Sequence, residues 1–142
     1  MRDYLIIIPA RYNSSRFPGK PLIKIKGKSM VQRVWEKCVK ASDKNCVIIA
    51  TDDQRILNHC KEKKMNCIIT SKTCLTGTDR LFEVSKKKLA KFYINVQGDE
   101  PLISISDIKK IIKVAKKNPK VIFNGMCKIS NKKDFINPNV PK

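Results

Sequence analysis

Residues 4–11 read YLIIIPAR, and this stretch decides the expected fold. Its apolar part, residues 4–8, predicts a buried strand. Short apolar runs of the same kind recur along the chain, and we expect a strand in each, at residues 46–50, 67–69, 92–96 and 121–123. Because such runs are typical of strands buried on both faces, they indicate a mainly parallel sheet.

Helical patterns separate these strands. Ser29 followed by Gln32 forms a plausible capping box, and apolar residues then recur at helical spacing. Further helices are expected to begin at Asp52–Asp53, at Thr78 and at Ser106. Strands that alternate with helices imply βαβ crossovers and helices on both faces of the sheet. We therefore predict a Rossmann-like, three-layer α/β/α fold.

The composition indicates one globular domain. A chain of 142 residues with a hydrophobic fraction of 42% can bury most of its apolar surface in one core, so we expect residues 1–142 to form a single domain. No apolar run approaches the length needed to span a bilayer, and the N-terminus lacks the features of a signal peptide. A cytoplasmic location without a membrane segment is expected. The six cysteines show no paired spacing, which favours reduced thiols.

The formal net charge of +19 raises the question of nucleic-acid binding, because lysine and arginine neutralise phosphates and release counterions. The lysines, however, occur in every segment and have no aromatic residues interleaved for base stacking. Solvated helix faces explain most of them. We therefore expect no specific nucleic-acid partner, although a basic nucleic-acid-binding module stays as an alternative.

The loop after the first strand carries the strongest functional signal, since ligands of such sheets bind outside the carboxyl ends of the strands. It reads ARYNSSRFPGKPL at residues 10–22. Its candidate phosphate ligands are Arg11, Ser14, Arg16 and Lys20. Guanidinium groups bind phosphate oxygens in pairs and lysine adds a point charge, so the loop could surround a polyphosphate. We favour this interpretation over a solvated basic loop shaped by prolines and a glycine.

A second motif, NVQGDEP at residues 95–101, places Asp99 and Glu100 after a buried strand and a glycine. A carboxylate at the carboxyl edge of a strand can ligate Mg²⁺, which bridges nucleotide phosphate oxygens and an attacking hydroxyl. Asp99 is the candidate ligand. A turn capped by these two carboxylates explains the residues equally well.

A third motif, TGTDR at residues 76–80, lies between a strand and a helix. Its hydroxyl groups and the helix N-terminus could face a base, a ribose or a phosphate. A plain helix start with Arg80 exposed fits the spacing equally well. Asp52 and Asp53, after the second strand, are interpreted as residues that begin a helix.

These motifs, in this order, resemble those of the 3-deoxy-manno-octulosonate (Kdo) cytidylyltransferases. That family shows an IPARxxSxRxPGKPL opening, a TDD-like segment, a GTDR helix start and NVQGDEP, all of which stand in this chain. Residues 135–139, FINPN, look like the family's FNPN segment. The resemblance implies a nucleotide-diphospho-sugar transferase fold. It also implies transfer of CMP from CTP to the anomeric hydroxyl of Kdo, which gives CMP-Kdo for lipopolysaccharide synthesis and releases pyrophosphate.

The resemblance implies roles for individual residues as well. Arg11, Lys20 and Asp99 would be catalytic, with Asp99 holding Mg²⁺ and Gln97 lying near the sugar acid. The implied CTP-binding residues are Pro9, Ala10, Arg11, Ser14, Arg16, Lys20, Thr76, Gly77, Thr78 and Arg80. Positioning and charge neutralisation supply most of such catalysis, and the sequence names no general base.

Members of that family continue for roughly a hundred residues beyond the last residue of this chain, a domain's worth of chain. We therefore expect a fold truncated at its C-terminus, without most of the sugar pocket, a second metal-binding aspartate and the dimer surface of the full-length homodimers. Three alternatives stay open. The acceptor could be 8-amino-Kdo, pseudaminic acid or sialic acid; the chain could be an inactive CTP-binding remnant; and it could bind nucleic acid with an affinity that CTP does not compete away.

Overall fold

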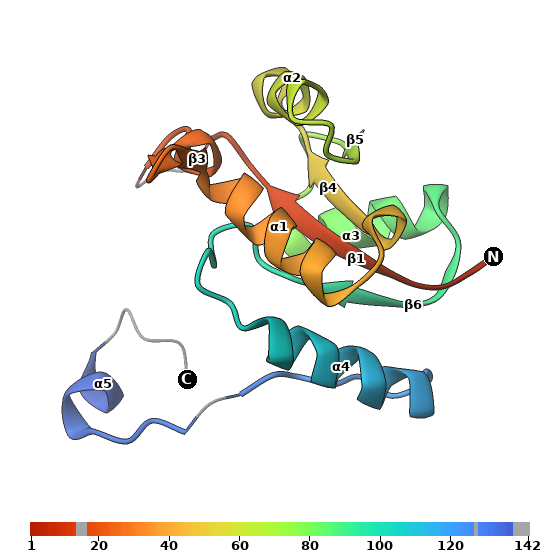
Figure 1. Cartoon of the computed structure of the whole chain (residues 1–142), viewed down its shortest axis with the longest axis vertical. Coiled ribbons are helices and arrows are strands. Elements are labelled where there is room, and N and C mark those ends of the chain that lie inside the picture. The colour runs from red at the N-terminus through yellow and green to blue at the C-terminus, as the bar shows by residue number, and fades with distance from the viewer. Residues whose placement is uncertain (14–16, 127, 138–142) are drawn as a thin grey trace.

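The computed structural model describes residues 1–13, 17–126 and 128–137 (Figure 1). Its strands are β1 (Arg2–Ala10), β2 (Lys24–Ile25), β3 (Lys28–Ser29), β4 (Val47–Thr51), β5 (Cys67–Ile69) and β6 (Ala90–Asn95). Its α-helices are α1 (Met30–Ala41), α2 (Gln54–Glu62), α3 (Gly77–Lys87), α4 (Ile105–Lys117) and α5 (Lys132–Ile136). Two short 3₁₀ helices are η1 (Lys20–Leu22) and η2 (Lys44–Cys46). Within these residues, four parallel strands form the main sheet in the order β5-β4-β1-β6.

Strand β1 lies inside the sheet because its residues are apolar on both faces. Leu5 and Ile7 belong to the core on one face, and Ile6 and Ile8 belong to the core on the other. All four side chains are at most 1% exposed. A strand covered on both sides has no polar face, so an unbroken apolar run was the correct signal for it.

Helices cover both faces of the sheet. Helices α1, α2 and α4 pack on the face that carries Ile6 and Ile8, and α3 packs on the opposite face (Figure 1). The predicted α/β/α layering is therefore confirmed. None of the described helices is both long and apolar enough to cross a membrane.

The first two helices begin where the sequence predicted. The Ser29 hydroxyl accepts a hydrogen bond from the Gln32 N–H at 3.2 Å, and the Asp53 carboxylate accepts one from the Arg55 N–H at 2.9 Å. The Gln32 side chain, however, donates to Glu36, so only half of the predicted capping box forms. These caps fix the start of α1 and α2 beside the ends of the strands.

The next two helices begin two residues earlier than predicted. Helix α3 is capped by Thr76 and not by Thr78, because the Thr76 hydroxyl accepts from the Asp79 N–H while the Asp79 carboxylate accepts from the Thr76 N–H. Such a reciprocal pair satisfies two backbone donors at once. Helix α4 begins after Ser104 and not after Ser106.

The strand predicted at residues 121–123 is wrong. Val121 and Ile122 are 56% and 96% exposed, and residues 121–123 form no strand. An apolar triplet becomes a strand only when a neighbouring strand pairs with its backbone and a layer of side chains covers it. Neither partner exists for this segment in the part of the chain that the structure describes.

Candidate active site

A cavity of about 410 Å³ lies at the carboxyl ends of β1 and β6. Its walls come from the loop after β1, the first turn of α3 and the loop after β6. The lining residues are Pro9, Arg11, Asn13, Phe17, Lys20, Pro21, Gly77, Gln97, Gly98 and Asp99. The fold thus brings the three predicted motifs together at the edge of the sheet where ligands of such folds bind.

The loop after β1 is held in place around Tyr12. The Gly19 N–H donates to the Tyr12 carbonyl at 2.8 Å, and the Arg55 guanidinium lies 3.2 Å from the centroid of the Tyr12 ring. Gly19 has a φ of 74°, and a Cβ at this position would lie 3.2 Å from the same ring. Both the positive φ and the close ring favour glycine at this position. The closed loop places Arg11 and Lys20 at the cavity.

Two cations of this loop, Arg11 and Lys20, contact the other walls. The Arg11 guanidinium donates to the Leu75 carbonyl at 2.7 Å, which joins the first loop to the segment before α3. The Lys20 ammonium lies 2.7 Å from the Asp99 carboxylate, and the two side chains are 38% and 51% exposed. Exposed ion pairs of this kind contribute at most about 1 kcal/mol, so a ligand can separate them at low cost.

Two glycines allow the walls to approach each other closely. A Cβ on Gly98 would lie 2.6 Å from the Pro9 carbonyl oxygen, closer than real Cβ atoms come. A Cβ on Gly77 would lie 3.0 Å from the Pro9 ring and 3.3 Å from the Gln97 amide nitrogen. Asp99 therefore reaches the cavity because the preceding glycine lies directly on the end of β1.

The structure sorts the predicted site residues into three groups. Those that line the cavity are Pro9, Arg11, Lys20, Gly77, Gln97 and Asp99. Those that lie apart from the lining are Ala10, which is buried, Thr76, which caps α3, Thr78, which is exposed, and Arg80. Ser14 and Arg16 lie outside the described residues. The individual roles of all these residues stay predictions.

Four lining residues were not named among the predicted site residues. They are Asn13, Phe17, Pro21 and Gly98. All of them lie inside the quoted motifs, so their position next to the named residues was the available signal. The sequence could not show which residues of these loops turn toward a common space.

Arg80 departs most from the sequence-based expectation. Its side chain has no exposed surface, and its guanidinium donates to the Asp52 carboxylate at 3.0 Å and to the Thr70 hydroxyl. The alternative of an exposed Arg80 is therefore wrong. The predicted place of Arg80 in the CTP site stays a prediction; its side chain is fully buried and is not among the residues that line the cavity.

The segment before α3 is ordered by Glu83. Its carboxylate accepts from the Lys87 ammonium at 2.6 Å, from the Ser71 N–H at 2.7 Å and from the Cys74 thiol at 3.4 Å. These contacts, the bond from Lys87 above all, lower the pKa of Glu83 to about 2. The loop that leads to the cavity is thus held by a carboxylate that stays charged in acid.

We expect the stabilising contribution of Glu83 to depend on pH. A lowered pKa in the folded state gives stability that is fully present above the unfolded pKa of about 4.5 and is lost as the pH falls toward about 2. In urea unfolding, the free energy of unfolding of the parent chain should exceed that of Glu83→Gln by a constant amount at neutral pH. This difference should shrink as the pH falls from about 4.5 to about 2. Glu100→Gln, an exposed glutamate after β6, is the control. A difference that stays constant down to pH 2 contradicts the prediction.

The described residues contain no group of three or more His, Cys, Asp or Glu side chains that could enclose a metal ion. Asp99 is the carboxylate among the residues that line the cavity. Mg²⁺ is usually bound by one or two carboxylates together with substrate phosphates and water. A lone carboxylate beside two cations therefore fits an ion that binds together with a nucleotide.

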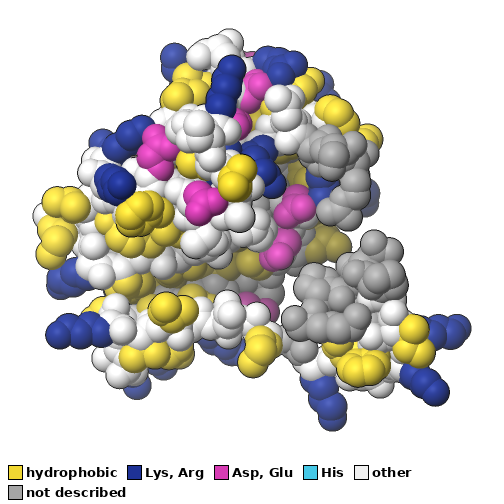
Figure 2. Space-filling view, turned by 180° about the vertical axis from the view of Figure 1, so that it is seen from behind, with side chains coloured by type: hydrophobic (Ala, Val, Ile, Leu, Met, Phe, Trp, Pro, Cys, Tyr) yellow, Lys and Arg dark blue, Asp and Glu magenta, His cyan; other side chains and the backbone are white. Residues whose placement is uncertain are grey.

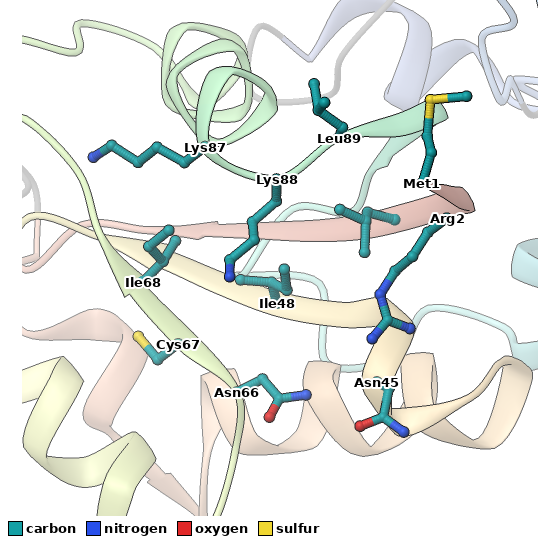
Figure 3. A pocket seen from close by; sticks show the side chains of 11 residues that line it. Met1, Arg2, Asn45, Ile48, Asn66, Cys67, Ile68, Lys87, Lys88 and Leu89 are labelled. Atoms are coloured by element: carbon teal, nitrogen blue, oxygen red, sulfur yellow. The ribbon is translucent and has the colours of Figure 1, made fainter.

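A second, larger cavity of about 860 Å³ lies toward the other end of the sheet (Figure 3). It is lined by residues at the amino ends of β1, β4 and β5 and at the C-terminal end of α3, among them Leu5, Ile48 and Lys88. None of the predicted site residues lies in it. Its position at the amino ends of the strands leaves the smaller cavity as the candidate active site.

Comparison with known proteins agrees with this geometry. The family model described as cytidylyltransferase matches residues 5–140. The 3-deoxy-manno-octulosonate cytidylyltransferase of Chlamydia trachomatis is 44% identical over 80% of this chain and 45% of its own length. The mitochondrial enzyme of the same name from Arabidopsis thaliana is 41% identical over 94% of this chain and 47% of its own length.

The solved structures give the same result. A CMP:2-keto-3-deoxy-manno-octonic acid synthetase complexed with CTP superposes with a TM-score of 0.76 at 40% identity, over 83% of this chain and 49% of that one. This chain thus spans about half the length of the relatives that it matches. The family model covers nearly all of it, and the chain belongs to the cytidylyltransferase family.

Proposed function

We propose that residues 1–142 are the CTP-binding portion of a single-domain enzyme that transfers CMP from CTP to the anomeric hydroxyl of Kdo. The products are CMP-Kdo, for lipopolysaccharide synthesis, and pyrophosphate. The observation that carries the proposal is the contact between Lys20 of the basic loop and Asp99 of the acidic motif, at a cavity lined by Arg11. Relatives whose names describe this reaction are 40–44% identical to this chain over the aligned residues.

Arg11 and Lys20 supply the positive charge that a triphosphate requires. One nitrogen of the Arg11 guanidinium donates a hydrogen bond to the Leu75 carbonyl. The guanidinium carries further N–H donors that can bind phosphate oxygens. Lys20 donates to Asp99 and could turn its ammonium to a phosphate of a bound nucleotide. Fixed cations at the reacting phosphate stabilise the charge that develops during transfer.

Asp99 is the proposed ligand of Mg²⁺. When bound, this ion would neutralise phosphate charge and polarise the phosphorus under attack. If Lys20 turned to a phosphate, the Asp99 carboxylate would be free to hold the ion.

Gln97 is the proposed contact of the sugar acid. Its amide nitrogen donates to the Asn95 side chain at 3.2 Å, which leaves the amide oxygen to accept a hydrogen bond from a sugar hydroxyl. On the same family likeness we propose a homodimer and a cytoplasmic location for the complete enzyme. We also propose Kdo ahead of 8-amino-Kdo, pseudaminic acid and sialic acid as its acceptor.

Calorimetric titration of the chain with CTP tests the nucleotide site. CTP should bind in the presence of Mg²⁺, and Arg11→Ala or Lys20→Ala should weaken binding about tenfold or more, since each removes a charged hydrogen-bond donor. Lys113→Ala, which removes an equal charge from an exposed residue of α4, should change little. The absence of CTP binding, or equal losses in all three variants, contradicts the proposal.

The acceptor is tested by pyrophosphate release in the complete enzyme, with each of the four acids in turn. CTP binding without turnover would support the inactive remnant. On the face shown in Figure 2, lysine and arginine side chains are scattered and lie among acidic side chains, so they form no single basic patch there. Affinity for RNA or DNA should therefore be weak and should fall steeply with salt.

A further inference from the structure

Arg80 is a buried charge in a chain whose other cations are at least partly exposed wherever the structure describes them. A charge removed from water destabilises a fold unless close partners compensate it. Here the compensation comes from Asp52 at 3.0 Å, from the Thr70 hydroxyl and from the Ser71 carbonyl at 3.4 Å. The Arg80 side chain is therefore held by partners that all lie outside its own helix.

The partners of Arg80 lie at the ends of two neighbouring strands. Asp52 directly follows β4, and Thr70 and Ser71 directly follow β5. The Thr70 N–H also donates to the Thr51 carbonyl at 2.8 Å, so the two strand ends are already adjacent. Arg80 itself stands in the first turns of α3. One guanidinium therefore ties two strand ends to the start of a helix.

The segment fixed by these contacts leads directly to the cavity. Residues 71–76 run from the Arg80 partners to Gly77, which lines the cavity next to Pro9 and Gln97. Within this segment the Leu75 carbonyl accepts the hydrogen bond from Arg11. A shift of the segment would consequently move both one wall of the cavity and the anchor of a phosphate-binding cation.

We propose that Arg80 is a positioning residue of the nucleotide site, which holds residues 70–77 and thereby Arg11 in place without touching the ligand. The inference rests on the proposed CTP site for the identity of the ligand. Lysine could not replace it, because the planar guanidinium offers donors in several directions while an ammonium is a compact point charge. Arg80→Lys should keep the pairing with Asp52 and lose the simultaneous reach to Thr70 and Ser71.

The test compares Arg80→Lys with Val84→Ala, a core change in the same helix at a fully buried residue outside the 70–77 segment. The first readout is hydrogen exchange of the backbone amides of residues 70–77 in the chain without nucleotide. The second is CTP affinity at a temperature at which both variants are folded. Arg80→Lys should accelerate exchange in this segment about tenfold and weaken CTP binding by a similar factor, as expected for the loss of about one hydrogen bond to a charged group.

Val84→Ala should lower the thermal midpoint while leaving exchange in residues 70–77 and CTP affinity close to the parent values. The inference is overturned if Arg80→Lys exchanges at the parent rate, or if Val84→Ala accelerates the same amides as strongly. Should Arg80→Lys not fold, Thr70→Val removes one partner, leaves the charge pair intact and is expected to give the same two effects at smaller size. If the parent chain does not bind CTP, the proposed function fails while hydrogen exchange still decides the role of Arg80.

Discussion

Replacing Gly98 by alanine should destabilise the protein by about 1–3 kcal/mol, the usual cost of forcing extra atoms into a packed position. The added Cβ would lie 2.6 Å from the Pro9 carbonyl oxygen, and this neighbour is backbone inside the sheet. Either β1 or the loop after β6 must move to relieve the contact. Because Asp99 follows directly, the same movement should displace it from Lys20 and weaken CTP binding. Urea unfolding and calorimetry measure the two effects.

Gly125→Ala is a matched control for this change. Among the residues that the structure describes, a Cβ at Gly125 would have no neighbour within 4 Å, so the same substitution there adds a methyl group without a close contact. Its stability should remain within about 0.5 kcal/mol of the parent, as is usual for surface changes. Equal stability of the two variants would show that the close approach at Pro9 does not constrain the site.

Replacing Asp99 by asparagine should lower the rate of pyrophosphate release by the complete enzyme at least about 100-fold, comparable to the loss of one fixed stabilising group in other active sites. The amide keeps the shape of the side chain and removes the charge that would hold Mg²⁺. Stability should change by less than about 1 kcal/mol, since the pair with Lys20 is exposed. A large loss of rate with little loss of stability would thus assign the effect to the active site and not to misfolding.

Glu100→Gln controls for the loss of one negative charge in the same loop, because Glu100 is exposed and does not line the cavity. It should keep most of the parent rate. An Asp99→Asn enzyme with the parent rate and the parent dependence on Mg²⁺ would refute the metal assignment. A similar loss of rate in Glu100→Gln would indicate that the total negative charge of the loop determines the rate, and not a metal contact made by Asp99 alone.

The sequence predicted the central sheet because each of its strands is an apolar run that needs cover on both faces. Ile6, Ile7 and Ile8 are buried and β4 is buried throughout, whereas the edge strands β5 and β6 are only partly buried, although each contributes side chains to both core clusters. The triplet at residues 121–123 shows where the rule stops. An apolar segment forms a buried strand only if a neighbouring strand and a covering helix are present. The composition of the segment does not show whether the rest of the fold provides them.

The sequence predicted which motifs contribute to the candidate site, but it did not predict how their side chains are arranged around the cavity. Arg11, Lys20 and Asp99 stand out by residue type and by their place after strands, but the ion pair across the cavity joins residues 79 positions apart in the sequence. Arg80 shows the same difficulty more clearly. Its burial depends on Asp52 and Thr70, which lie on other elements, so no local pattern distinguishes it from an exposed arginine at a helix start.

The ion pair between Lys20 and Asp99 also bears on which ligands the proposed site prefers. An anion such as inorganic phosphate that draws Lys20 away leaves the Asp99 carboxylate to water alone, and a free cation that binds Asp99 leaves the Lys20 ammonium to water alone. A ligand that brings phosphate and metal together satisfies both residues at once. We therefore expect the proposed site to prefer the metal-bound nucleotide over these simpler ions, by no more than the roughly 1 kcal/mol that an exposed ion pair contributes.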